Sequence, residues 1–158
     1  RAVGEEEFLV HAGDVYIVTN KGAHYSRLVS VTESEKSEAT LLIKEVPDPR
    51  GKGVVEVREK TEGVYAVVSA VEKPEIAKSK LVIEPIYVFQ PSIFAALKNS
   101  GRGKTREIQL TDGIATLIRQ GSCVCATLLR PYEKSLDIGD VDSHWKAVAL
   151  SHSLASRT

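Results

Sequence analysis

Short apolar runs alternate along this chain with segments whose apolar residues recur at helical spacing. The runs are rich in β-branched residues and predict strands at residues 7–11, 39–46, 54–57, 64–68, 81–89 and 122–129. The first two of these strands are expected to be buried. Helical spacing covers residues 21–35, 93–97, 108–118 and 140–150. Such alternation predicts an α/β fold in which a mixed, mostly parallel sheet is flanked by helices. In folds of this kind ligands bind at the carboxyl ends of the strands.

Glycine and proline mark the boundaries between these segments. The charged stretch at residues 58–63 separates two β-rich runs and predicts a hairpin. Pro85 interrupts the run at residues 81–89, so this strand should lie at a sheet edge or carry a bulge, because proline donates no hydrogen bond to a neighbouring strand. Gly121 should end the helix at residues 108–118, and residues 136–139 are interpreted as a turn. Residues 101–104 predict a flexible basic loop.

Length and charge exclude several classes of protein. With 158 residues, of which 42% are hydrophobic, the chain is expected to form a single domain over residues 1–158. Its 21 lysines and arginines balance 21 aspartates and glutamates, so no overall field attracts a nucleic acid polymer or an anionic membrane. The apolar runs are far shorter than the ~20 residues of a membrane-spanning helix, and no leader pattern opens the chain. A cytoplasmic location is therefore expected.

The cysteine, histidine and tryptophan residues are expected to have structural roles and no catalytic or metal-binding role. Cys123 and Cys125 are two residues apart in a strand-like run, which places both on one face and favours buried free thiols over a disulfide. The four histidines show no pairing with a candidate nucleophile and are expected to pack or face solvent. Trp145 is expected in the core.

Two aspartates are candidate metal ligands. Asp14 and Asp137 each follow an apolar stretch and lie close to a glycine, where an α/β fold presents its ligand site. Mg²⁺ takes few protein carboxylates and fills its other positions with substrate phosphate oxygens and water, so two aspartates are enough. The alternative, from the residues alone, is that each aspartate is an ordinary turn or helix-cap residue.

Six segments occur in the order found in sugar-1-phosphate nucleotidylyltransferases, and the chain resembles that family. They read FLVHAGDVYI (8–17), EVPDPRGKGVVEV (45–57), VVSAVEKPE (67–75), SKLVIEPIYVFQPSIF (79–94), REIQLTDGIATLI (106–118) and LDIGDVDSHWKAV (136–148). The resemblance implies a Rossmann-like nucleotide-diphospho-sugar transferase fold. It also implies an Mg²⁺-dependent enzyme that forms an NDP-sugar, UDP- or dTDP-glucose, and pyrophosphate from a nucleoside triphosphate and a sugar 1-phosphate. The residues at 109–112 and 139–140 resemble the uridylyltransferase branch of the family more than the thymidylyltransferase branch.

The resemblance also assigns roles to particular residues. It implies that Asp14 and Asp137 share Mg²⁺, that Lys73 contacts the sugar 1-phosphate, and that the catalytic set is these three residues. Glu72 would contact the sugar hydroxyls, and the backbone at Gly53 would lie close to the sugar, since glycine permits close approach. Lysine and Mg²⁺ suit this chemistry because the reaction brings two anions together.

The chain departs from the family pattern at three places. The N-terminal glycine-rich segment that cradles nucleotide phosphates has no counterpart, so the residues given are expected to be the C-terminal part of the domain, inactive alone. Glu84-Pro85 stands where the family has a small residue and glycine beside the sugar, and Arg106 replaces a common glycine.

Two hypotheses follow from these departures. The chain is part of an active transferase, or it is a non-catalytic sugar-phosphate-binding or regulatory subunit that needs a partner chain. In either case we expect a homo-oligomer or association with an N-terminal part, because an incomplete sheet leaves an unpaired strand edge.

Overall fold

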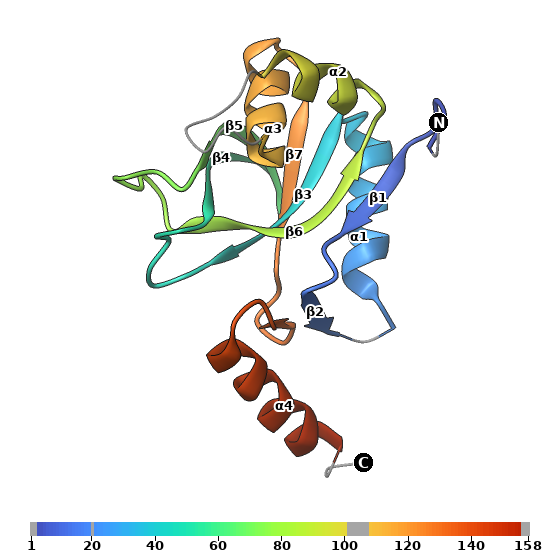
Figure 1. Ribbon diagram of the computed structural model, residues 1–158. Helices are drawn as coiled ribbons and strands as arrows, with labels where there is room; N and C mark the ends of the chain where they lie inside the picture. The colour runs from blue at the N-terminus through green and yellow to red at the C-terminus, as the bar shows by residue number, and fades with distance from the viewer. Residues whose placement is uncertain (1–2, 20, 101–107, 156–158) are drawn as a thin grey trace.

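The computed structural model describes residues 3–19, 21–100 and 108–155. The predicted loop at residues 101–104 and Arg106 lie outside the described residues. Groups of strands are interspersed with helices, as Figure 1 shows. The strands are β1 (Phe8–His11), β2 (Val15–Val18), β3 (Ala39–Glu45), β4 (Gly53–Thr61), β5 (Val64–Glu72), β6 (Leu81–Phe89), β7 (Val124–Leu128) and β8 (Lys134–Asp137). The helices are α1 (Ala23–Glu35), α2 (Ser92–Asn99), α3 (Leu110–Arg119) and α4 (Val141–Ala155).

Six strands form one mixed sheet in the order β1-β6-β3-β7-β5-β4, and β2 and β8 form a separate small sheet. The predicted mixed sheet with flanking helices is therefore confirmed. Its expected predominance of parallel strands is not found, because among the described pairings only β3 with β7 is parallel. Short connections such as the predicted and confirmed β4–β5 hairpin can only join antiparallel strands, whereas a parallel pair needs a long crossover.

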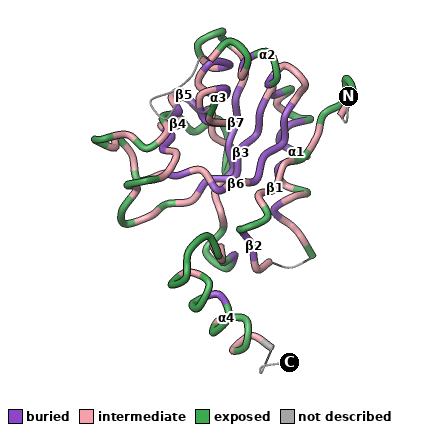
Figure 2. Tube along the Cα trace, in the orientation of Figure 1, coloured by how far each residue is buried: buried purple, intermediate pink, exposed green. Residues whose placement is uncertain are grey.

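Helices cover both faces of the large sheet. Successive residues of β3 point to opposite faces: Leu41 and Ile43 belong to the core formed with α2 and α3, and Leu42 belongs to the core formed with Leu28 of α1. Figure 2 shows the buried residues concentrated along β3, β6 and β7. The centre of the sheet is thus fixed between two apolar layers.

Strands β1 and β6 differ from their sequence interpretation. The run at residues 7–11 was expected to be a buried strand, but β1 lies at the sheet edge and Leu9 is 42% exposed, because β1 pairs with β6 alone. In contrast, β6 lies inside the sheet, so the edge interpretation of Pro85 is wrong and the bulge is confirmed. The β6 partner jumps from Tyr87 opposite Leu41 to Glu84 opposite Leu42.

Gly121 ends α3 as predicted. Its φ of 79° is accessible to glycine without strain, and the N–H groups of Gly121 and Ser122 donate to the carbonyls of Ile118 and Leu117, each at 3.0 Å. The thiols are also free, as expected, with their sulfur atoms 3.8 Å apart. Cys125 is buried and burial raises its pKa to about 12, whereas Cys123 is only half-buried.

The expectation that Trp145 lies in the core is wrong. Trp145 is 74% exposed on α4, which packs next to β8 and projects from the body of the molecule (Figure 1). Its helical spacing was predicted correctly, but Val141, Trp145 and Val148 form an exposed apolar stripe on that helix. Within the described ranges, no helix combines the length and the apolar character that crossing a membrane requires.

Candidate active site

The small sheet brings Asp14 and Asp137 together. Val15 of β2 pairs with Asp137 of β8, and Ile138 donates its N–H to the carbonyl of Asp14 at 2.9 Å. The sequence interpretation of residues 136–139 as a turn is therefore only partly right. Strand β8 continues to Asp137, and the chain turns after it. The missed strand is short and polar, and its pairing with β2 is what makes it a strand.

Both carboxylates adjoin Gly139. The Gly139 N–H donates to Asp137 Oδ1 at 2.8 Å. A side-chain carbon at position 139 would lie 3.1 Å from that oxygen and 3.7 Å from Asp14 Oδ2. The two aspartates, from opposite ends of the chain, thus face one small volume of space.

One cavity of about 460 Å³ unites most of the predicted site. Its walls include Asp14, Asp137, Glu72 and Gly53. Lys73 is not among the described lining residues. Its side chain is 59% exposed and its Nζ lies 3.9 Å from Glu72 Oε1, beside a carboxylate that does line the cavity. The structure therefore brings four of the five predicted residues to one cavity and leaves Lys73 beside it.

Close packing fixes Glu72 against Gly53. These residues are opposite one another in the β4–β5 register. Thr111 of α3 donates a hydrogen bond of 2.7 Å to Glu72 Oε2, and a side-chain carbon at Gly53 would lie 3.1 Å from both of these oxygens. Only glycine fits at this position without displacing the Glu72–Thr111 pair.

The strand end after Glu72 has an unusual backbone. Lys73 has a φ of 43°, a left-handed conformation that is uncommon for residues other than glycine. Its N–H donates to the carbonyl of Lys52 at 3.1 Å, which continues the contact between the ends of β4 and β5. The backbone thus turns at Lys73, the residue predicted to contact the sugar 1-phosphate.

Sequence reasoning missed several residues of the cavity wall. Thr111 belongs to a segment that matches the family, but the sequence favoured a role in fixing its helix, and Lys44 gave no separate signal; the partners of both residues are distant in the chain. Glu84 did give one, as a departure from the family pattern, and it is 3% exposed and lines the cavity with Lys44. Among the described lining residues, the carboxylates of Asp14, Glu72, Glu84 and Asp137 outnumber the ammonium groups of Lys44 and Lys52.

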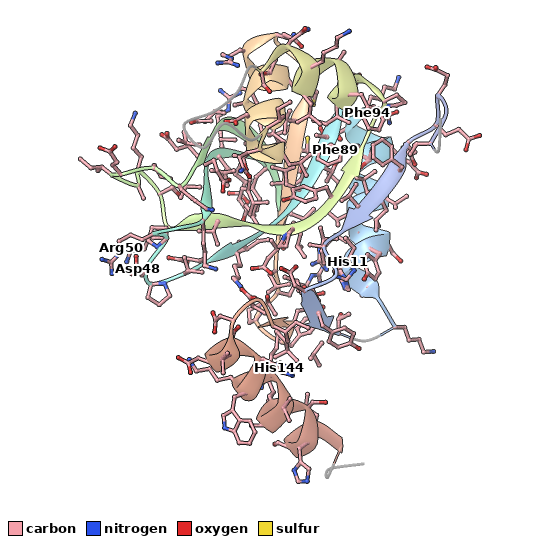
Figure 3. All side chains as sticks on the ribbon, in the orientation of Figure 1. His11, Asp48, Arg50, Phe89, Phe94 and His144 are labelled. Carbon is pink, nitrogen blue, oxygen red and sulfur yellow. The ribbon has the colours of Figure 1, made fainter. Side chains whose placement is uncertain are left out.

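The end of the loop between β3 and β4 lines this cavity at Gly51 and Lys52, whereas Asp48 and Arg50 of the same loop are not among the described lining residues. Asp48 and Arg50 form an exposed ion pair there, and both are labelled at the loop in Figure 3. Hydrogen bonds from the Arg50 side chain and backbone lower the pKa of Asp48 to about 2. Asp48 is therefore an ionised aspartate on the same chain but outside the cavity lining.

The sequence profile of one family, described as nucleotidyl transferase, matches residues 1–153. The chain belongs to the nucleotidyl transferase family. A glucose-1-phosphate thymidylyltransferase from Streptomyces griseus is 32% identical over 142 residues, which cover 88% of this chain and 36% of that protein. A UTP–glucose-1-phosphate uridylyltransferase from Bacillus subtilis (strain 168) is 34% identical over 148 residues, which cover 92% and 48%. These relatives confirm the resemblance to sugar-1-phosphate nucleotidylyltransferases.

Solved structures of the family share the fold. UDP-glucose pyrophosphorylase complexed with UDP-glucose matches with a TM-score of 0.88 at 27% identity, over 96% of this chain and 58% of that one. UTP-bound UGPase from Acinetobacter baumannii matches with a TM-score of 0.76 at 30% identity, over 95% and 52%. The α/β nucleotidyltransferase fold is thus confirmed. The chain spans about half, or less, of the length of the relatives it matches.

Proposed function

We propose that this chain contributes the sugar-binding and metal-binding part of a sugar-1-phosphate nucleotidylyltransferase. The reaction joins a nucleoside triphosphate and a sugar 1-phosphate into an NDP-sugar and releases pyrophosphate. One observation carries the proposal: Asp14 and Asp137 converge with Glu72 and Gly53 on a single cavity. The relatives are named for glucose 1-phosphate and for UTP or thymidylyl transfer, which supports UDP- or dTDP-glucose as the product.

The cavity fits a magnesium ion at Asp14 and Asp137. Both residues line it, and their carboxylates adjoin the same point next to Gly139. The excess of carboxylates over lysines in the described lining favours a bound cation. The described residues contain no cluster of three or more metal-ligating side chains, and Mg²⁺ needs none, since phosphate oxygens and water complete its coordination. When bound, Mg²⁺ would reduce the repulsion between the two phosphate groups.

The other residues of the site bind and orient the sugar phosphate. Glu72 presents a carboxylate held by Thr111, which suits hydrogen bonds from sugar hydroxyls. The backbone of Gly53 lets the sugar approach the wall closely. Lys73 offers an exposed ammonium group beside Glu72 for the sugar phosphate. No protein nucleophile is required, because a phosphate oxygen of the sugar 1-phosphate attacks the α-phosphorus and pyrophosphate leaves.

A cytoplasmic location and association with a further polypeptide segment complete the proposal. Both suit an enzyme whose substrates are nucleotides and sugar phosphates.

An NMR titration of this chain with glucose 1-phosphate, with and without Mg²⁺, tests the function. We expect chemical-shift changes at Gly53, Glu72 and Thr111, and a further Mg²⁺-dependent change near Gly139. Asp137→Asn should remove the Mg²⁺-dependent change, because an amide is a weaker ligand for a hard cation than a carboxylate.

The matched control is Asp48→Asn, which changes an aspartate outside the cavity lining. It should leave both responses unchanged. Shift changes that avoid the cavity, or an Mg²⁺-dependent change that survives in Asp137→Asn, would contradict the proposed site.

A further inference from the structure

Glu84 and Lys44 line the cavity and form a polar cluster with Ser135. Ser135 donates a hydrogen bond of 2.6 Å from its Oγ to Glu84 Oε2, and Lys44 donates to Ser135 Oγ at 3.2 Å. Lys44 also forms an ion pair with Glu84 Oε1. The cluster joins three strands: β3 and β6 of the large sheet and β8 of the small one.

The cluster is fixed because the carboxylate of Glu84 is buried. Its side chain is only 4% exposed, and a buried carboxylate is costly unless it is paired and hydrogen-bonded. Lys44 and Ser135 supply these partners from two different strands. The position of Ser135 relative to the large sheet is therefore held by a buried charge.

Ser135 lies two residues before Asp137 on β8. Residues two apart on a strand point to the same face, so Ser135 and Asp137 share the side of β8 that faces the cavity. In the described residues β8 pairs with β2 and not with the large sheet, and the Ser135–Glu84 bond is a side-chain contact between β8 and the large sheet.

Pro85 makes the matching contact to the other aspartate. Its carbonyl accepts a hydrogen bond of 3.0 Å from Ala12, which lies two residues before Asp14. The bulge in β6 falls at Pro85 and Ile86, which the register with β3 passes over. Glu84 and Pro85 thus hold the segments of both aspartates, each at the residue two positions before the carboxylate.

We propose that Glu84 is a positioning residue for the metal-binding carboxylates, acting through Ser135 to fix the orientation of Asp137 toward Asp14. This inference rests on the proposed function, since it needs a cation at these aspartates. Groups that orient metal ligands affect metal affinity without touching the metal. The dipeptide that departs from the family pattern is then part of the metal site and not a change in the sugar pocket alone.

Two variants weaken the cluster at different points. Ser135→Ala removes the link to β8, and Glu84→Gln removes the charge that binds Lys44 while keeping the shape of the side chain. Glu133→Gln is the matched control, because Glu133 anchors the start of β8 through a 2.7 Å ion pair with Arg27. All three variants should lower the melting temperature, so stability alone does not separate them.

Mn²⁺ titrations followed by paramagnetic broadening of backbone NMR signals provide the decisive readout. In the unsubstituted chain the broadening should centre on Asp14, Ile138 and Gly139. Ser135→Ala and Glu84→Gln should each weaken Mn²⁺ binding by about tenfold, and the double variant should be no weaker than either single one. Glu133→Gln should bind Mn²⁺ as the unsubstituted chain does.

A second readout needs no metal. The Gly139 N–H donates to Asp137 Oδ1, so its chemical shift reports the orientation of that carboxylate. Ser135→Ala should move this signal in metal-free protein, and Glu133→Gln should not. An unmoved Gly139 signal, or unchanged Mn²⁺ affinity in Ser135→Ala, would overturn the positioning role. A moved signal in a chain that never binds Mn²⁺ would instead uphold the positioning and overturn the proposed metal site.

Discussion

Thr111 donates a hydrogen bond of 2.7 Å to Glu72 Oε2, and this bond ties α3 to the end of β5 in the cavity wall. Thr111 is only 6% exposed, so its hydroxyl group has little access to water. The carboxylate that we propose for the sugar hydroxyls is thus held by a residue of α3 that lines the same cavity. Glu72 is oriented before a ligand arrives, which lowers the entropic cost of binding.

Thr111→Val should weaken binding of glucose 1-phosphate and lower the unfolding free energy by about 1 kcal/mol, the value of one hydrogen bond. Valine keeps the shape of threonine and removes only the donor. Thr116→Val is the control, because Thr116 donates to the carbonyl of Asp112 within the same helix. Urea denaturation and NMR titration measure the two effects. Equal losses of affinity in both variants would contradict a specific role for Thr111.

Gly53→Ala should reduce sugar-phosphate binding more strongly than Thr111→Val. The new methyl group would lie 3.1 Å from both Glu72 Oε2 and Thr111 Oγ1, so both side chains must move. We expect a loss of roughly 1–3 kcal/mol in unfolding free energy, which is typical of overpacking. Thermal denaturation and the same titration check this. A variant with unchanged affinity would show that the backbone at position 53 does not approach the sugar.

Local patterns predicted the elements that local forces determine. The helical spacing at residues 21–35 and the turn residue Gly121 produced α1 and the end of α3 as expected. By contrast, β8 is a strand because it pairs with β2, and Trp145 is exposed because no described element covers that side of α4. Neither the pairing of β8 nor the exposure of Trp145 can be predicted from the residues adjacent to them in the sequence.

In the candidate site, too, the sequence predicted some residues and missed the partners that only folding brings to them. Asp14, Asp137, Glu72 and Gly53 were predicted from motif order, and the fold brings them to one cavity. The partners that orient the carboxylates were missed, because Thr111 and Lys44 meet Glu72 and Glu84 only after the chain has folded. A single sequence gives residue types at each position but not which distant side chains come into contact.

Stability should fall between neutral and mildly acidic pH because of His24. This histidine is 2% exposed, and neither ring nitrogen has a hydrogen-bond partner among the residues that the structure describes. Burial lowers its pKa from the ordinary 6.5, while the nearby Glu133 opposes that shift and Arg27 adds to it. The unfolded chain therefore binds a proton that the folded chain does not, so unfolding free energy is lost as pH falls below about 6.5, by at most about 1.4 kcal/mol per pH unit.

His24→Leu should flatten this pH dependence between pH 7 and 5, as measured by urea denaturation at each pH. His144→Gln is the control, because His144 is exposed on α4, as Figure 3 shows, and should leave the slope unchanged. A slope that persists in His24→Leu would assign the pH dependence to another group.

The 158-residue chain alone should bind UTP with Mg²⁺ weakly or not at all. The glycine-rich segment that cradles nucleotide phosphates is absent from these residues, and backbone N–H groups of that kind provide much of the affinity for phosphate. Isothermal titration calorimetry measures this directly. Micromolar affinity would show that the nucleotide site is formed by other residues.

The exposed stripe on α4 should make the isolated chain self-associate. Val141, Trp145 and Val148 recur at positions i, i+4 and i+7, so they lie along one face of the helix, and they are 86%, 74% and 47% exposed. A contiguous apolar surface of this kind favours association in water, and a formal net charge of zero provides little repulsion to oppose it. Light scattering should therefore report dimers or larger species at micromolar concentration.

Trp145→Lys should shift this equilibrium toward monomer, because it places a charge in the centre of the stripe. Lys146→Gln is the control, since Lys146 is also exposed on α4 and lies beside the stripe without belonging to it. The fluorescence of Trp145, the only tryptophan in the chain, should shift to longer wavelength on dilution as its ring becomes exposed to water. A monodisperse monomer of the unsubstituted chain at all concentrations would show that the α4 stripe is not an association surface.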